Sequence, residues 1–242
     1  MMGLIGGRST PPGGGTFDPT SIFGSGEQGI IYDLTNSATV FQERTGASAT
    51  TPSGDVEPIG SLKDLSPNNN YCVAPTDGQR PLWNSAGYLS TDGVDDLLNA
   101  LFTMNQTYCR VSCIRINTHV SERIYSDGSG AGGGFLFNVS GDDIGIYAGS
   151  TLTIATQTAG SDFVITERYS GATSRGALNN GSYVTGDAGT GNASGITIAN
   201  TNPASLATSG RFYRIIMIDR DLTDVEIANC RTWCGAAAGL TL

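Results

Sequence analysis

Three aspartates lie close together in the sequence and could bind a metal ion. Asp92, Asp95 and Asp96 belong to the segment Asp92-Gly93-Val94-Asp95-Asp96, the densest group of carboxylates in the chain. Carboxylate oxygens are the ligands that a hard cation such as calcium prefers. An Asp-Gly pair is also typical of a turn, and aspartates can accept backbone hydrogen bonds without a metal. Both interpretations stay open, because the sequence does not reveal a full set of roughly six to eight oxygen ligands.

Aromatic side chains are the second group that could do chemistry, because their rings can stack on sugar rings. We select Trp83, Tyr125 and Tyr147 as candidate glycan contacts. In a β-sandwich, aromatic side chains more often belong to the core. The strand register decides which face each ring occupies, and register is not evident from the sequence.

Groups suited to catalysis are sparse. His119 is the only histidine, and no serine nucleophile motif lies near it. Glycoside hydrolysis needs two carboxyl groups roughly 5–10 Å apart, which acidic residues at alternate strand positions would supply. Asp142 and Asp143 are adjacent and so point to opposite faces, while Asp162 and Glu167 are isolated. We therefore expect a protein that is not an enzyme and that has no cofactor apart from the candidate calcium.

Charge and composition limit the partners further. The formal net charge is −9, and a single lysine accompanies twelve arginines, so a basic surface for nucleic acid is not expected. The sequence contains no apolar run of about 18 residues, so membrane insertion is not expected. The start of the chain lacks the apolar stretch of a secretory signal. We expect synthesis in the cytoplasm, where the five cysteines would stay reduced and be buried as small apolar groups.

The elements that must position these groups are mainly short strands. Apolar runs alternate with turn residues from Gly29 onward, which predicts an all-β, two-sheet antiparallel sandwich. In the run 108–116, Cys109, Val111 and Cys113 alternate with Arg110 and Ser112, as in a half-buried strand, with a possible bulge after Cys113. The run 211–218 is apolar on both faces and predicts a central strand covered on two sides.

One short helix is expected near the C-terminus. Thr223-Asp224-Val225-Glu226 has the pattern of a capping box. Ile227, Cys230 and Cys234 then form an apolar stripe, and Gly235 ends the helix.

The chain divides into an arm and one domain. Residues 1–29 are rich in glycine and proline, without periodicity, and predict an extended N-terminal arm. Whether this arm is a free tail or lies along a neighbouring subunit stays open. Residues 30–242 are expected to form a single sandwich domain. Gly132-Gly133-Gly134 is interpreted as a turn, because no Lys-Ser/Thr pair follows it as in a phosphate-binding loop.

Two segments carry a resemblance to a known family. The first includes Tyr32-Asp33, Val40-Phe41-Gln42-Glu43, Asp64-Leu65-Ser66-Pro67-Asn68-Asn69, Arg80-Pro81 and Thr91-Asp92-Gly93-Val94-Asp95-Asp96; the second is Leu222-Thr223-Asp224-Val225-Glu226-Ile227. They resemble the concanavalin A-like/laminin-G-like jelly-roll domains of tailed-bacteriophage structural proteins. Thr91 departs from the phenylalanine that the family has before Asp-Gly, and the middle of the chain shows no matching motif.

The resemblance implies a jelly-roll fold and a role in a virion. It implies a non-enzymatic structural protein on the particle surface, as capsid decoration, head spike, fibre or tail ornament, attached through the arm. The expected partners are then other virion proteins and further copies of the chain in a homo-oligomer. The alternative is a lectin-like module that binds host-surface glycans. Because one fold serves many functions, the resemblance favours the fold more strongly than the function.

Overall fold

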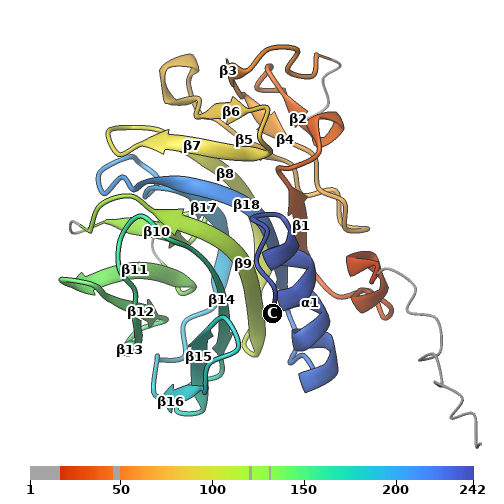
Figure 1. Ribbon diagram of the computed structural model, residues 1–242. Helices are drawn as coiled ribbons and strands as arrows, with labels where there is room; N and C mark the ends of the chain where they lie inside the picture. Colours follow the sequence, from red (N-terminus) through yellow and green to blue (C-terminus); the bar gives the residue numbers. More distant parts are fainter. Residues whose placement is uncertain (1–16, 46–49, 120–121, 131) are drawn as a thin grey trace, which may run out of the picture.

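The computed structural model describes residues 17–45, 50–119, 122–130 and 132–242. Two nine-stranded antiparallel sheets pack face to face, and α1 (Asp224–Ala236) lies on the outer face of one of them (Figure 1). The described part of the chain also contains three short 3-10 helices: η1 (Pro19–Ile22), η2 (Ser37–Thr39) and η3 (Asp77–Gln79). The two-sheet antiparallel sandwich predicted from the sequence is confirmed.

The first sheet, sheet A, carries the helix. Its strands run in the order β16 (Val184–Gly186), β15 (Ser174–Leu178), β14 (Asp162–Tyr169), β9 (Tyr108–Ile116), β18 (Ser209–Ile218), β7 (Tyr88–Asp92), β6 (Leu82–Asn84) and β3 (Val56–Pro58). β18 is long enough to pair along the same edge with both β7 and β1 (Gly29–Asp33).

The second sheet, sheet B, forms the opposite layer of the sandwich. Its order is β13 (Thr151–Thr156), β12 (Asp143–Tyr147), β11 (Phe135–Ser140), β10 (Arg123–Ser126), β17 (Ala193–Ile198), β8 (Leu98–Met104), β5 (Cys72–Val73), β4 (Ser61–Leu62) and β2 (Val40–Phe41).

Two apolar cores enclose sheet A. The larger lies between the sheets, and the smaller lies between sheet A, α1 and η1. β18 serves both, since Phe212, Ile215 and Met217 face the first core while Tyr213, Ile216 and Ile218 face the second. This confirms the prediction of a central strand covered on two sides.

β9 differs from the half-buried strand that was expected. Cys109, Val111 and Cys113 face α1, as their alternation predicted, but Arg110 and Ser112 point into the sandwich and are fully buried. Both faces are covered because α1 packs along β9 (Figure 1). The irregularity expected after Cys113 lies instead in the partner strand, where the register between β9 and β18 shifts between Phe212 and Arg214.

The helix begins at the predicted capping box. The Glu226 N–H donates to Thr223 Oγ1 over 3.3 Å, and the Thr223 N–H donates to Glu226 Oε2 over 2.8 Å. The stripe of Ile227, Cys230 and Cys234 is buried against sheet A, which confirms the predicted orientation. All five cysteines are buried thiols, as expected. Within the described residues, no helix is both long and apolar enough to cross a membrane.

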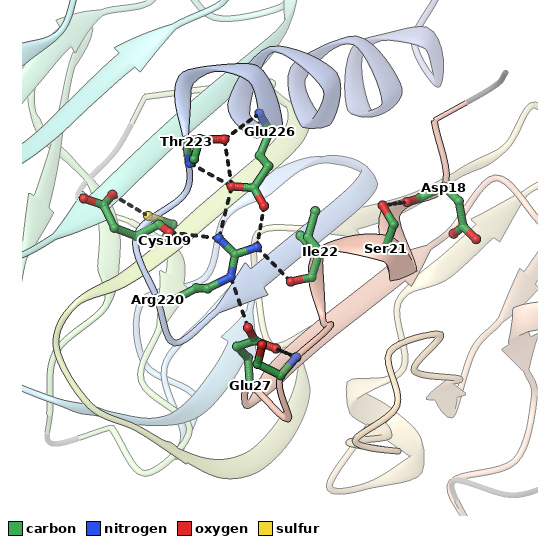
Figure 2. A network of polar contacts seen from close by, with 10 residues as sticks. Asp18, Ser21, Ile22, Glu27, Cys109, Arg220, Thr223 and Glu226 are labelled. Carbon is green, nitrogen blue, oxygen red and sulfur yellow. Dashed lines mark hydrogen bonds and ion pairs between the residues drawn. The ribbon is translucent and has the colours of Figure 1, made fainter. Parts of the chain in front are cut away.

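The predicted arm is partly integrated into the domain. Residues 1–16 lie outside the described residues, but Ile22 and Phe23 are buried in the second core. The Arg220 guanidinium binds this segment, lying between Glu226 and Glu27 and beside Ile22 (Figure 2): it donates to Ile22 O over 2.8 Å, pairs with Glu27 over 3.4 Å, and also donates to Glu226 of the capping box. The boundary expected at residue 29 therefore moves towards residue 17.

Candidate functional site

The three aspartates come together after β7. One carboxylate oxygen from each of Asp92, Asp95 and Asp96 lies within 4.8 Å of the others. Turn hydrogen bonds are present as well, since the Val94 N–H donates to Asp92 and the Asp92 N–H donates to Asp96 over 3.0 Å. The pKa of Asp96 is raised to about 7, mainly by burial; the charges of Asp92 and Asp95 contribute to this rise, and the hydrogen bond from the Asp92 N–H opposes it.

Crowding of carboxylates in this way favours either a bound proton or a bound cation. Three carboxylates supply only part of a calcium shell, so backbone carbonyls or water would have to complete it. Calcium binding by Asp92, Asp95 and Asp96 stays a prediction.

Two of the three candidate glycan contacts are placed in the core. Trp83 is 6% exposed, and its indole N–H donates to Leu34 O over 2.8 Å. Tyr125 is fully buried between the sheets, with its ring edge-on to Phe212 and its face beneath the Arg110 guanidinium. A ligand cannot reach either ring, so we correct the expectation that Trp83 and Tyr125 contact a sugar. Their strand faces point inward, which register alone decided.

Tyr147 lies at a pocket of about 720 Å³ on the outward face of sheet B. In β11 and β12, Leu136, Ile144 and Ile146 face the core, so side-chain alternation directs Phe135 and Tyr147 to the other face. These two residues are direct cross-strand partners, and their rings meet edge-to-face with centroids 5.7 Å apart. They provide the aromatic floor of the pocket.

A glycine-rich rim surrounds this floor, contributed by Gly130, Gly132, Gly149, Gly189 and Gly191. The loops are hydrogen-bonded to one another: the Ala148 N–H donates to Ala188 O, and the Gly191 N–H donates to Ala148 O. Gly189 has φ +90°, and a Cβ there would lie 2.3 Å from Ala148 O, so a side chain cannot be accommodated. Gly132 and Gly133, where a turn was predicted, form a bend before β11, and the Gly133 N–H donates to Asn192 O.

Two charged side chains complete the pocket, and sequence reasoning missed both. Asp187 lies on the rim, where its carboxylate accepts from the Gly189 N–H over 2.8 Å. Arg123, at the start of β10, places its guanidinium carbon 5.2 Å from the centre of the Phe135 ring and 4.5 Å from that of Phe137. Burial lowers the pKa of Arg123, although an arginine keeps its charge at neutral pH. The only signal in the sequence was the aromatic-rich segment 135–137 opposite this strand.

A second, smaller hollow of about 210 Å³ adjoins the first. It is lined by Glu122, Arg123, Phe137, Asn138 and Leu206, so that Arg123 belongs to both. The single histidine lies beside this hollow, with its Nδ1 3.1 Å from the Asn138 amide nitrogen and 3.9 Å from Glu122 Oε1. The two hollows thus share the cation Arg123, and each has its own aromatic lining: Phe135 and Tyr147 in the larger and Phe137 in the smaller.

No protein-family model matches this sequence, and no curated protein matches it. Solved structures do match the fold. A GH54 α-L-arabinofuranosidase with a cyclic sulfate inhibitor has a TM-score of 0.63 and 14% identity, covering 91% of this chain and 65% of that one. An arabinofuranosidase complexed with arabinofuranosyl-α-1,2-xylobiose has a TM-score of 0.60 and 15% identity with the same coverage. Trypanosoma rangeli sialidase in complex with sialic acid has a TM-score of 0.54 and 11% identity, covering 81% of this chain and 33% of that one.

These matches show the fold. The chain is a jelly-roll-like sandwich. It spans less than two thirds of the enzymes it matches, 65% of the arabinofuranosidase and 33% of the sialidase.

The matches also correct two expectations. We expected a non-enzymatic structural protein of a bacteriophage virion, and a chain that is not an enzyme. The structures that share this fold are carbohydrate-active enzymes, an arabinofuranosidase and a sialidase, so neither expectation is retained.

Proposed function

We propose that this domain recognises a carbohydrate in the pocket on the outward face of sheet B. The observation that carries the proposal is the pocket itself: an aromatic floor of Phe135 and Tyr147, flanked by the charged side chains of Arg123 and Asp187.

The shape and chemistry of the pocket suit a sugar. Its volume of about 720 Å³ is in the usual range for a small-molecule site. The half-exposed Tyr147 ring offers an apolar surface to the C–H groups of a pyranose or furanose. Arg123 supplies hydrogen-bond donors and Asp187 supplies acceptors for hydroxyl groups. The rim loops are already hydrogen-bonded to each other, so binding would cost little ordering entropy.

The comparisons lend support by analogy of fold. The matching arabinofuranosidase and sialidase were solved with an arabinofuranosyl-xylobiose and with sialic acid. At 11–15% identity this analogy concerns the scaffold, and the site must be argued from its own residues. Of the partners expected from the sequence, the glycan is the one that the pocket supports. The virion localisation, the virion partners and the homo-oligomer stay predictions.

A glycan array followed by calorimetry tests the proposal. We expect the protein to bind a defined set of oligosaccharides, and Tyr147→Ala to weaken that binding at least tenfold, about 1.4 kcal/mol. Tyr71→Ala is the matched control, because Tyr71 is also half-buried but precedes β5, five strands from β12 in the same sheet. At roughly 4.8 Å per strand that is about 24 Å away. An array without binding, or equal losses in both variants, would refute carbohydrate recognition at this pocket.

An activity assay distinguishes a domain that only binds a glycan from one that also cleaves it. The same protein is incubated with 4-nitrophenyl α-L-arabinofuranoside, with arabinofuranosyl-xylobiose and with a sialoside. Sugar release that Asp187→Asn abolishes would extend the proposal to hydrolysis, because Asp187 is a carboxylate that lines the pocket.

A further inference from the structure

Among the residues that the structure describes, none forms an ion pair with Arg123. Within the described ranges, its guanidinium forms no ion pair and no side-chain hydrogen bond; its recorded side-chain contacts are with the faces of Phe135 and Phe137. Three other buried or half-buried arginines do form ion pairs: Arg110 with Glu167, Arg214 with Asp33 and Arg220 with Glu226. Arg123 is half-buried and lines both hollows, so its donors are accessible to a ligand.

Because of this arrangement, an anion that pairs with Arg123 would gain binding free energy. Burial removes part of the water around the guanidinium, which lowers the pKa of Arg123. The two phenylalanine rings hold the group by cation–π contact and fix its orientation. A guanidinium so fixed offers its N–H groups as a fork, which matches the two oxygens of a carboxylate.

The charges around Arg123 indicate where the anion can lie. Asp187 is on the rim of the larger hollow, bound to the Gly189 N–H, and the buried Glu122 lines the smaller hollow beside His119. Both would repel an anion placed next to them. The acceptor oxygens of Asp187 suit sugar hydroxyls. A negative group is therefore favoured at the junction of the hollows, over Arg123, with neutral parts of the ligand on either side.

We infer that the site takes an acidic oligosaccharide, in which the carboxylate of a uronic or sialic acid pairs with Arg123 and the adjoining sugar units occupy the two hollows. This inference rests on the proposed carbohydrate recognition and adds the class of sugar. It also accounts for the two hollows that share Arg123, because a single sugar ring would leave one of them unfilled.

Matched acidic and neutral probes test the inference by calorimetry. The pairs are digalacturonate with galactobiose, and sialyllactose with lactose. We expect the native protein to bind at least one acidic probe tenfold or more tightly than its neutral counterpart. Arg123→Gln should abolish this preference for the acidic probe, and Arg123→Lys should retain part of it, because lysine keeps the charge but not the fork.

Arg211→Gln is the charge-matched control. Arg211 also stacks on an aromatic ring, with its guanidinium carbon 4.5 Å from the centre of the Tyr88 ring, but it lies on β18 in the other sheet. The variant Arg211→Gln should leave the preference for the acidic probe unchanged. Thermal melting confirms that each variant is folded before binding is measured.

The outcomes separate this inference from the proposed function. Neutral and acidic probes that bind equally, or an acidic preference that Arg211→Gln removes as fully as Arg123→Gln, would overturn the acidic ligand and leave carbohydrate recognition standing. A monomeric galacturonate that binds as tightly as digalacturonate would overturn occupancy of both hollows. Absence of binding to every glycan would instead overturn the proposed function.

Discussion

Glu167→Gln should destabilise the sandwich by about 3–5 kcal/mol, because it leaves the Arg110 cation buried without its counter-charge. Both side chains are fully buried between the sheets. The Arg110 Nε–H donates to Glu167 Oε1 over 2.9 Å, a second N–H donates to Oε2, and a third donates to Gly134 O over 3.0 Å. Tyr169 also donates to Glu167, over 2.6 Å.

The loss should be visible in equilibrium urea unfolding followed by tryptophan fluorescence. In a chain of this length, about 3–5 kcal/mol corresponds to a fall in melting temperature of roughly 6–20 °C. Asp77→Asn is the control, since it breaks the ion pair between Arg44 and an aspartate whose side chain is 75% exposed. Such a surface pair contributes about 0–1 kcal/mol.

A double variant distinguishes the charge effect from a packing effect. Arg110→Met with Glu167→Leu removes both charges and keeps most of the volume, so it should recover most of the stability. Tyr169 stays satisfied in this variant, because its single O–H can donate instead to Phe135 O, which lies 2.8 Å away. The reasoning would be refuted by a loss below about 1 kcal/mol in Glu167→Gln, or by a double variant less stable than the single one.

Three further predictions concern pH, capping and thiols. The folded-state pKa of Asp96 is about 7, mainly because of burial, against about 3.9 in an unfolded chain, so the free energy of unfolding should fall as pH rises from about 4 to 7. Asp96→Asn should flatten this slope in urea titrations. Calcium should raise the melting temperature more at pH 8 than at pH 5, and an unchanged melting temperature would count against the metal prediction. The hydrogen bond from Arg220 lowers the pKa of Glu226 to about 2, so the stabilisation from ionised Glu226 is full above about pH 4.5 and lost as pH falls towards 2. Glu226→Gln should remove this acid-dependent part of the free energy of unfolding, and Thr223→Ala should lower that free energy by about 1 kcal/mol at neutral pH. An unchanged unfolding curve would show that the capping box contributes little. Burial raises the pKa of all five cysteine thiols, so a thiol reagent at pH 8 should label none in the native protein and five in urea, and rapid native labelling would contradict the burial.

The local pattern of the sequence was enough to predict much of the fold. Alternation and turn residues predicted the strands, the all-apolar run 211–218 predicted a strand between two cores, and Thr223 and Glu226 predicted where the helix begins. These features depend on neighbours within a few residues, which is why they could be inferred before any packing was known.

The direction of side chains depended on what covers each sheet. Arg110 and Ser112 looked like the solvent side of β9, yet α1 covers the cysteine face and the polar face points into the sandwich. For the same reason Trp83 and Tyr125 are core residues while Tyr147 is accessible. Alternation in the sequence defines the two faces of a strand but does not show which face is buried. The layers that pack on the strand decide this.

The sequence by itself determined the all-β class, several of the strands, the start of the helix and the burial of the thiols, because period and composition act locally. The tertiary structure alone decided the candidate site. Arg123, Phe135, Tyr147 and Asp187 are separated by as many as 64 positions and share no motif. They meet because β10, β11 and β12 are neighbours in sheet B and because the loop after β16 folds back against the loop after β12. Such a pocket is a product of long-range strand pairing, which no local pattern in the chain specifies.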